Sequence, residues 1–178
     1  MSRSGGDGEE NFPNEAALWW ANADRALRGK RGRKALADLR EALLALPEKR
    51  LIARALSTVG KPEPERYPDD HRDLLAEQGE GMCAVGAYAW HQRVKAGADP
   101  LEAMRSLPLN ADYDGDPWVT QRVGEDAGLA GVLAWQLMSR NDDTYEGLTP
   151  EQRHDAYLAW IDEQLAVPAP ADARSDAQ

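Results

Sequence analysis

The feature that most constrains this chain is its strong bias toward residues that favour helix over strand. Alanine occurs 29 times and leucine 20 times, whereas valine and isoleucine together occur only nine times in 178 residues. Alanine and leucine are strong helix formers, while β-branched residues are the ones that pack best in strands. No segment alternates apolar and polar residues over a β-rich run. The sequence therefore predicts an all-α fold.

The apolar residues recur with helical spacing, which predicts a compact bundle of about seven or eight short helices. The longer helices are expected at about 14–27, 33–46, 48–58, 82–95, 118–126, 129–139 and 149–166. Gly29 and Gly32 are expected to separate the first two helices. Asp99 is expected to cap a short helix that runs to Leu107, because Pro100 follows it directly. Thr149 is expected to cap the last helix, because proline follows it directly and glutamine stands three residues on.

The composition changes at both ends of the chain. Residues 1–12 are rich in serine, glycine and acidic residues, and residues 167–178 are rich in proline, alanine and aspartate. Such segments bury too little apolar surface to fold, so both ends are predicted to be disordered. The sequence therefore predicts a single helical domain over residues 13–166.

The overall charge restricts the partners of the protein. Lys and Arg number 21 and Asp and Glu 31, which gives a net charge of −10 at pH 7. A chain this acidic does not dock on an anionic membrane or wrap nucleic acid around its whole surface. The single cysteine excludes an intramolecular disulfide framework and a multi-cysteine zinc site. With no apolar run of membrane-spanning length and no signal-peptide stretch, a cytoplasmic protein without a membrane partner, metal or cofactor is expected.

Positive charge is concentrated in one segment, residues 25–54, which we call the basic island. It holds ten Lys and Arg against three acidic residues, a net charge of +7, so the other 148 residues carry −17. Its densest part is the sequence RGKRGRK at 28–34. The candidate ligand-binding residues are Arg28, Lys30, Arg31, Arg33, Lys34, Lys49 and Arg50.

The basic island admits two interpretations. Arg31, Arg33 and Lys34 crowd a predicted helix start, where the positive end of the helix dipole disfavours cations. A bound anion would relieve that repulsion, and two glycines would let it approach the backbone. The ligand would then be a phosphate, a nucleic-acid backbone or an acidic protein surface. In the alternative interpretation the cations are solvated or pair with the acidic loops at 110–116 and 141–146.

Residues 119–137 have the spacing of a helix-turn-helix unit, with glycine in the turn. The helix that would read DNA is AGVLAWQLM, in which Gln136 is the only polar side chain. It carries no arginine, lysine or asparagine to contact base edges. This pair of helices is therefore expected to belong to the core rather than to bind DNA.

Cys83 is the only residue that could act as a thiol nucleophile. His91 or His154 could serve as its base, and Asn141 or Asp142 could orient that base. However, Cys83 shares an apolar helix face with Trp90, which favours a buried structural role. A separate acidic loop, with aspartates at 112, 114 and 116, resembles the start of a calcium loop but lacks glycine and glutamate at the required positions, so it is expected to form turns.

Several strings resemble a group of uncharacterised small helical proteins from high-GC bacteria and their phages. They are the RGKRG start at 28–32, PEKRLI at 47–52, GMCAVGA at 81–87 and the Asn141-Asp142 pair before the final helix. The resemblance covers roughly residues 15–165, with 61–73 as an insertion. It implies relatedness and a phage-type accessory role with a host protein partner, and it implies no mechanism.

The leading hypothesis is a small non-catalytic binding protein that engages a nucleic acid or an acidic protein surface through the basic island. One alternative is a cysteine-dependent hydrolase or transferase centred on Cys83, with His154 and Asp142. Another alternative is a protein–protein inhibitor that uses its acidic surface to mimic nucleic acid.

Overall fold

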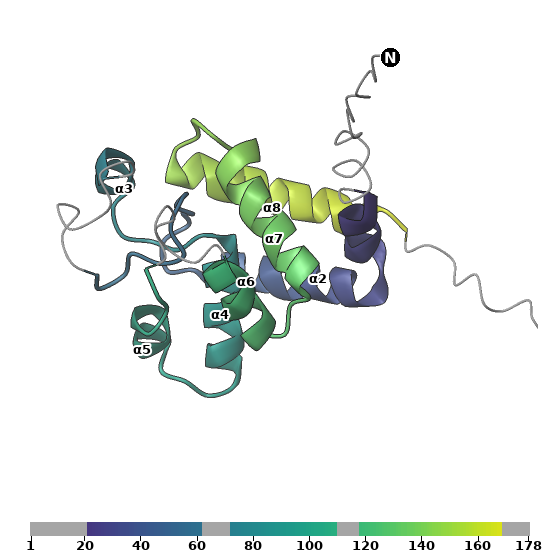
Figure 1. The fold of residues 1–178 in the computed structure, drawn as a ribbon, viewed down its shortest axis with the longest axis horizontal. Coiled ribbons are helices and arrows are strands. Elements are labelled where there is room, and N and C mark those ends of the chain that lie inside the picture. The colour runs from purple at the N-terminus through teal and green to yellow at the C-terminus, as the bar shows by residue number, and fades with distance from the viewer. Residues whose placement is uncertain (1–20, 62–71, 110–117, 169–178) are drawn as a thin grey trace, which may run out of the picture.

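A computed structural model describes residues 21–61, 72–109 and 118–168 of the chain (Figure 1). Over these residues the fold is all-α, as the sequence predicts. Residues 21–28 are helical. The helices that follow are α2 (Lys30–Ala45), α3 (Arg72–Gln78), α4 (Ala84–Lys95), α5 (Pro100–Arg105), α6 (Trp118–Asp126), α7 (Gly131–Ser139), the π-helix η3 (Arg140–Thr144) and α8 (Pro150–Ala166).

Helix α4 lies at the centre of the packing and contacts α2, α5, α6 and α7. This position explains its composition, because every residue from Ala84 to Trp90 is buried. Small residues allow close approach on this helix: a Cβ on Gly86 would collide with the backbone of Leu56. Helix α4 is therefore the element around which the others assemble.

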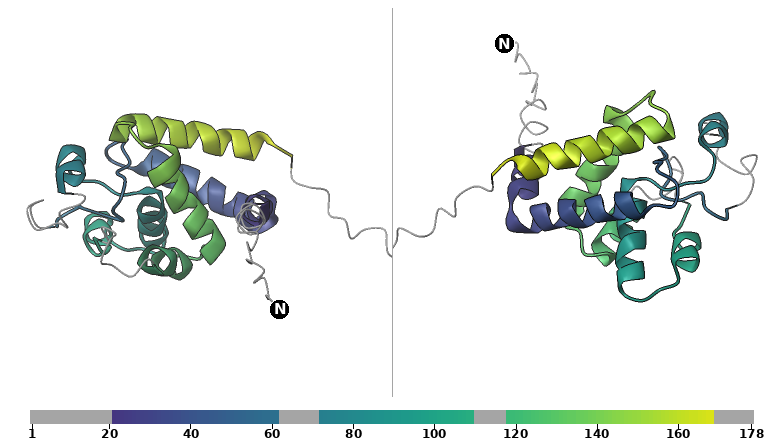
Figure 2. Two further views of the ribbon diagram at one scale, coloured as in Figure 1. Left: turned by 45° about the horizontal axis from the view of Figure 1, so that its top comes forward. Right: turned by 180° about the vertical axis from the view of Figure 1, so that it is seen from behind.

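Helices α2 and α8 lie side by side on one flank of the bundle (Figure 2). The inner stripe of α2 is leucine-rich, with Leu36, Leu39 and Leu43 almost completely buried. On α8, Tyr157 and Ile161 are fully buried. The Tyr157 hydroxyl donates to the Leu137 carbonyl at 2.9 Å, so burial of this ring leaves no polar group unsatisfied.

Two predicted helix starts are confirmed at the level of single hydrogen bonds. Thr149 accepts from the Gln152 backbone N–H, and the Gln152 side chain accepts from the Thr149 N–H, which completes a capping box. The Asp99 carboxylate accepts from the N–H groups of Leu101 and Glu102, and Pro100 follows it directly. These local signals decided both boundaries without help from tertiary packing.

The helix predicted over 48–58 is wrong, because this stretch has no regular helix. Its backbone instead bonds to distant parts of the chain: Leu51 N–H donates to Pro150, Ile52 N–H to Met82, and Leu56 N–H to Leu109. Ser57 also forms an isolated antiparallel bridge with Met82. The apolar residues of this stretch are buried as expected, but they lie in an irregular segment that passes between the helices. We call residues 46–61 the threaded segment.

The predicted break at Gly32 is also wrong. Helix α2 begins at Lys30, three residues before the predicted start, and Gly32 lies in its first turn. A Cβ on Gly32 would lie 2.5 Å from the Leu27 carbonyl oxygen and 2.6 Å from the Leu27 Cα. This glycine is therefore needed for close packing against the preceding helix. Gly29 alone separates the two helices.

The predicted disordered ends, 1–12 and 167–178, lie outside the described residues except for Val167 and Pro168. The aspartate-rich loop at 110–116 and most of 61–73 also lie outside them. Among the helices of the described ranges, none combines the length and the apolar character that crossing a membrane requires.

Candidate functional site

Three of the candidate cations in the basic island are engaged in intramolecular contacts. Arg33 donates to the carbonyl oxygens of Leu165 at 2.8 Å and Val167 at 2.6 Å, so it caps the C-terminal end of α8. Lys49 donates to the carbonyls of Leu44 and Leu46 at the end of α2. Both contacts place a cation at the negative end of a helix dipole, where it stabilises the helix.

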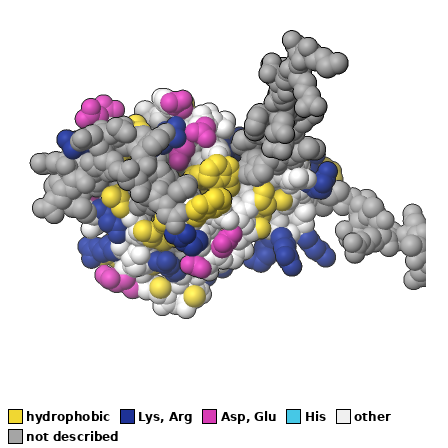
Figure 3. All heavy atoms as spheres, viewed as in Figure 1, with side chains coloured by type: hydrophobic (Ala, Val, Ile, Leu, Met, Phe, Trp, Pro, Cys, Tyr) yellow, Lys and Arg dark blue, Asp and Glu magenta, His cyan; other side chains and the backbone are white. Residues whose placement is uncertain are grey.

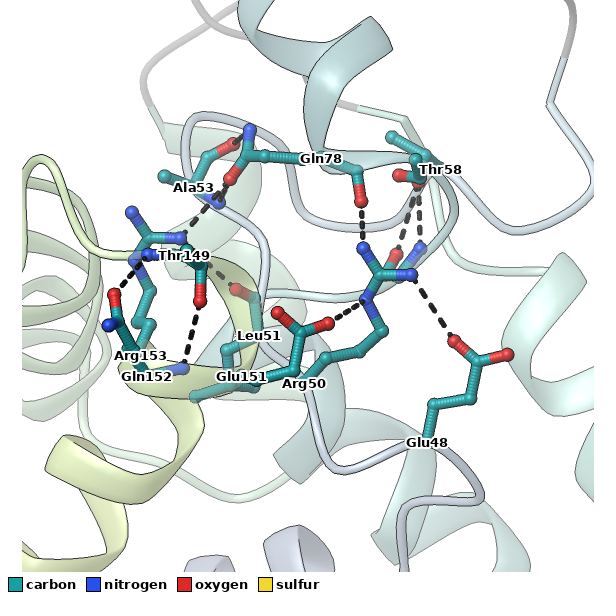
Figure 4. Close-up of polar contacts among 12 residues, drawn as sticks. Glu48, Arg50, Leu51, Ala53, Thr58, Gln78, Thr149, Glu151, Gln152 and Arg153 are labelled. Atoms are coloured by element: carbon teal, nitrogen blue, oxygen red, sulfur yellow. Dashed lines mark hydrogen bonds and ion pairs between the residues drawn. The ribbon is translucent and has the colours of Figure 1, made fainter.

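Arg50 is also held within the protein (Figure 4). It donates to the Gln78 carbonyl and forms ion pairs with Glu48 at 3.3 Å and Glu151 at 3.6 Å. These contacts join the threaded segment to α3 and α8. Arg33, Lys49 and Arg50 therefore have intramolecular partners, but these are backbone carbonyls, Glu48 and Glu151 rather than the acidic loops that the sequence suggested.

Lys34 is partly engaged. Its ammonium lies 2.5 Å from the Asp38 carboxylate, yet 75% of its side chain is exposed, against 10% for Asp38. Lys95 approaches the same carboxylate at 3.3 Å. Burial raises the pKa of Asp38, but the hydrogen bonds from Lys34 and Lys95 outweigh burial, and the net pKa is lowered. The Asp38 charge is thus balanced by two cations.

Arg28, Lys30 and Arg31 remain, and we call these three residues the free cations. All three are exposed, and none forms a hydrogen bond or ion pair with any part of the chain that the structure describes. They lie where helix 21–28 turns into α2. Figure 3 shows Lys and Arg side chains gathered along the edge of the molecule beneath the N-terminal part of α2.

The start of α2 is electrostatically unusual. Its N-cap is Gly29, which offers no side-chain oxygen, and its first turn contains no acidic residue. Lys30 and Arg31 therefore stand in the first turn, at the positive end of the helix dipole, an arrangement that disfavours cations and favours an external anion. The carbonyl oxygens of Ala26 and Leu27 pack against Gly32 on the inner side of this turn.

A cleft of about 550 Å³ lies beside the free cations. Arg31 and Lys34 stand on its α2 side, Tyr88 and Gln92 on its α4 side, and Ala130 at the start of α7. The Gln92 amide nitrogen is buried and has no hydrogen-bond partner in the structure. Burial and the nearby Asp38 carboxylate raise the pKa of Tyr88, so its hydroxyl is a neutral donor at physiological pH. The cleft thus combines two cations and neutral hydrogen-bond donors with two carboxylates, Asp38 and Glu125.

A buried polar network lies at the N-terminal end of α8, the end away from the Arg33 contacts (Figure 4). Arg153, only 2% exposed, donates to the Leu51 carbonyl at 3.1 Å, to the Gln78 amide oxygen at 3.2 Å and to the Tyr145 carbonyl at 3.3 Å. Gln78 also accepts from the Ala53 N–H at 2.6 Å. These two side chains satisfy backbone groups of the threaded segment that no helix or sheet could satisfy.

The candidates derived from the sequence did not include Arg153 or Gln78. A signal for Arg153 was present, because Tyr157, Trp160 and Ile161 follow it at i+4, i+7 and i+8 and form a single buried stripe. An arginine in line with such a stripe must itself be buried and hydrogen-bonded. No comparable pattern marks Gln78, because its partners come from the threaded segment and from α8.

Asn141 and Asp142, both in the π-helix η3, complete this network. The Asn141 amide donates to the Ile52 carbonyl at 2.8 Å and to the Asp142 carboxylate at 2.7 Å. The same carboxylate accepts from the Arg54 N–H at 3.1 Å. Arg54 has a φ of 60°, and it is the only non-glycine residue with positive φ in the described ranges. Asn141 and Asp142 therefore hold a strained turn of the threaded segment in place.

The Asp142 carboxyl gives a testable pH dependence. Burial raises its pKa above the ordinary 3.8, despite hydrogen bonds from Asn141 and the Arg54 N–H that favour the charged form. The folded protein therefore binds this proton more tightly than the unfolded chain does. The resulting stabilisation is complete below the unfolded pKa and is lost as pH rises through the raised pKa.

We expect the wild type to lose stability relative to Asp142→Asn as the pH is raised from about 4 to 7, a range that starts near the unfolded pKa of aspartate. Urea unfolding at a series of pH values measures the difference between the two proteins. Asp143→Asn, which removes the exposed neighbouring carboxylate, should retain most of the wild-type pH dependence. If the difference in free energy of unfolding between wild type and Asp142→Asn stayed constant across this pH range, the raised pKa of Asp142 would be contradicted.

The proposed cysteine-centred arrangement is not assembled through its histidines. Cys83 is buried at the N-cap of α4, and its sulfur accepts from the Gly86 N–H at 3.5 Å. His154 directs its two ring nitrogens to the Leu43 carbonyl and to Asp155, each at 3.1 Å. His91 lies 3.6 Å from Glu41. The hydrogen bonds of these histidines therefore lead away from the thiol, while Asn141 and Asp142 bind the threaded segment.

The described parts of the chain also contain no group of three or more His, Cys, Asp or Glu side chains arranged to hold a metal ion. A comparison with models of known protein families, with curated proteins and with solved structures finds no match for this chain.

Proposed function

We propose that this protein is a non-catalytic binding module that engages the phosphates of a nucleic-acid backbone through Arg28, Lys30 and Arg31. The observation that carries this proposal is the division of the basic island. Arg33, Lys49 and Arg50 are directed into the protein, whereas the free cations are exposed and have no partner among the described residues. Exposed cations without such a partner are available to an external anion.

The position of the free cations supports the same proposal. Lys30 and Arg31 stand in the first turn of α2, beside backbone N–H groups and an uncapped helix end. Each cation at such an exposed end is disfavoured by about 0.3–1 kcal/mol, and a phosphate placed there removes this cost. The cation charge and the backbone donors would act on the same ligand.

The remaining surface limits how large the contact can be. The chain carries a net charge of −10, so a polyanion is attracted at the basic island and repelled elsewhere. A short footprint of about three phosphates follows from the three free cations. For a single strand, three released counterions lower the affinity about 20-fold between 50 and 200 mM salt.

The test is the salt dependence of binding to fluorescently labelled DNA and RNA, measured by polarisation. We expect wild-type affinity to fall by about 20-fold over that salt range, and the triple variant Arg28→Ala, Lys30→Ala, Arg31→Ala to lose both the affinity and its salt dependence. The matched control changes Lys61, Arg105 and Arg122 to alanine. It alters the net charge equally on other parts of the surface and should bind as the wild type does.

Equal binding by wild type and the triple variant would overturn the proposal. Failure of the wild type to bind any nucleic acid would overturn it as well. If the free cations instead bind an acidic protein, an anionic peptide will bind the wild type and not the triple variant, while nucleic acid binds neither. That result would replace the nucleic acid by a protein partner.

A further inference from the structure

A second hollow, of about 400 Å³, opens between α6 and α7. Its lining includes two tryptophans, Trp118 on α6 and Trp135 on α7, together with Gln121 and Val132. Trp118 is 57% exposed, the largest value among the exposed large apolar side chains of the described residues. Single exposed apolar residues are ordinary, but two indoles around one hollow are typical of a site that accepts a flat ring.

This hollow adjoins the cleft beside the free cations. Ala130 lines the cleft and the next residue, Gly131, lines the hollow, so the two cavities meet at the start of α7. The view in Figure 3 places apolar side chains over α7 on the same face as the cations beneath the N-terminal part of α2. A ligand that crosses the start of α7 would contact Arg31 and Lys34 at one end and the indoles at the other.

The carboxylates at this junction define which part of a ligand occupies each cavity. Asp38 in the cleft is paired with Lys34 and Lys95, so its charge is compensated. Glu125 lines the cleft and borders Gly131, a residue of the hollow, and it accepts from the Gln121 amide at 2.8 Å with no cation paired to it in the described structure. Because Glu125 repels a phosphate, the phosphate fits the side of the cleft that Arg31 and Lys34 occupy on α2. None of the described residues that line the hollow is charged, so the hollow is left to the base, whose amino groups the neighbouring Glu125 carboxylate can accept.

We infer that the nucleic acid is single-stranded, with one unpaired base packed against Trp118 and Trp135 and the adjoining phosphates on Arg31 and Lys34. This inference rests on the proposed function and adds the class of nucleic acid. A base within a duplex is stacked on both faces and presents only its edges, so an indole reaches a base face only on an unpaired strand. Aromatic stacking beside a cationic groove is the general means of binding single strands without reading sequence.

The experiment compares three ligands of equal length, about 12 nucleotides, which lies within the usual site sizes of such proteins. They are a single strand with bases, a single strand of abasic sites and a duplex. Wild type should bind the base-containing strand about tenfold more tightly than the abasic strand, because stacking on an aromatic side chain strengthens binding by about this factor. It should also prefer that strand to the duplex.

Trp118→Ala should bind the base-containing strand only as tightly as the abasic strand, with the salt dependence of the wild type retained. Trp118→Phe keeps an aromatic face and should retain most of the preference for bases. The matched control is Leu101→Ala, which truncates another exposed apolar side chain, 48% exposed on α5. It should bind all three ligands as the wild type does, and thermal unfolding checks that each variant is folded.

The two proposals fail in distinguishable ways. Equal wild-type affinity for the base-containing and abasic strands overturns the stacking inference and leaves phosphate binding intact, and this comparison needs no variant. Equal or tighter binding to the duplex overturns the inference in the same way. Failure to bind any of the three ligands overturns both the inference and the proposed function.

Discussion

Replacing Gly32 with alanine is expected to destabilise the protein by about 2 kcal/mol, although alanine is the better helix former. The new methyl group would lie 2.5 Å from the Leu27 carbonyl oxygen and 2.6 Å from its Cα, well inside the roughly 3.5 Å at which such atoms normally meet. Both are backbone atoms, so relief requires helix 21–28 to move away from α2. Overpacking typically costs 1–3 kcal/mol, and contacts with fixed backbone atoms put this case at about 3 kcal/mol, from which the gain of about 1 kcal/mol in helix propensity is subtracted.

The matched control for this prediction is Gly29→Ala, three residues away in the same RGKRG string. Gly29 has a φ of −69°, which alanine adopts without strain, and a Cβ there would lie 3.4 Å from the Ala26 carbonyl oxygen. We expect a loss of about 0.5–1 kcal/mol, since glycine is a better N-cap than alanine and no other contact changes. Urea denaturation measures both variants. A Gly32→Ala protein as stable as Gly29→Ala would show that the two helices do not pack as described.

Replacing Arg153 with methionine is expected to be the most destabilising of these changes, by about 3 kcal/mol or more. The guanidinium donates to Leu51, Gln78 and Tyr145, and methionine of similar length would leave all three acceptors buried without that donor. Leaving a buried acceptor without its donor costs about 1–3 kcal/mol, and this change affects three acceptors. The threaded segment should open first, since these bonds hold it against α8.

Two further variants separate this network from a general effect of losing an arginine. Arg93→Met removes a helical arginine that donates to the Ser106 hydroxyl at the surface, so its loss should cost only about 0.5–1 kcal/mol. The double variant Arg153→Met, Gln78→Leu removes an unsatisfied acceptor together with the donor. The double variant should lose less free energy of unfolding than the sum of the losses of the two single variants, by about 1 kcal/mol or more. Strict additivity, measured by the same denaturation method, would refute direct coupling of Arg153 to Gln78.

These stability predictions also bear on the binding surface. Arg33 lies within the densest part of the basic island, yet its contacts with Leu165 and Val167 attach the end of α8 to the start of α2. The packing of Gly32 sets the angle at which helix 21–28 meets this same corner. The free cations therefore project from a corner that is held on two sides, which keeps them together although they form no bond with the described part of the chain.

Much of the helical architecture could be predicted from local signals. Alanine and leucine content predicted the fold class, and side-chain caps at Asp99 and Thr149 predicted where two helices begin. The predicted limits of the helix at 118–126 agree with α6. The same reasoning was wrong for 48–58, where the apolar spacing is helical but the backbone donors find acceptors on α3, α8 and η3 and on residues 81, 82 and 109, which lie outside the helices. Periodicity reports which side chains are buried, and it does not report where the backbone hydrogen bonds go.

The sequence predicts the candidate site only as a concentration of positive charge, without showing which cations are available for binding. Ten cations within residues 25–54 are visible in the sequence, but their division into structural and free groups is not. The acceptors of Arg33 and Arg50 lie far along the chain, at the end of α8 and in α3. The same holds for the two tryptophans, which α6 and α7 bring around one hollow.

The sequence by itself determined the helical class, several helix boundaries and the location of excess positive charge, because each of these depends on residue type and on neighbours within one or two turns. Only the tertiary structure decided the path of the threaded segment, the burial of Arg153 and the exposure of Arg28, Lys30 and Arg31. Each of these depends on hydrogen-bond and ion-pair partners that are distant in sequence. A cation becomes structural or free according to which acceptors folding brings within about 3 Å, and that distance is a property of the packed helices alone.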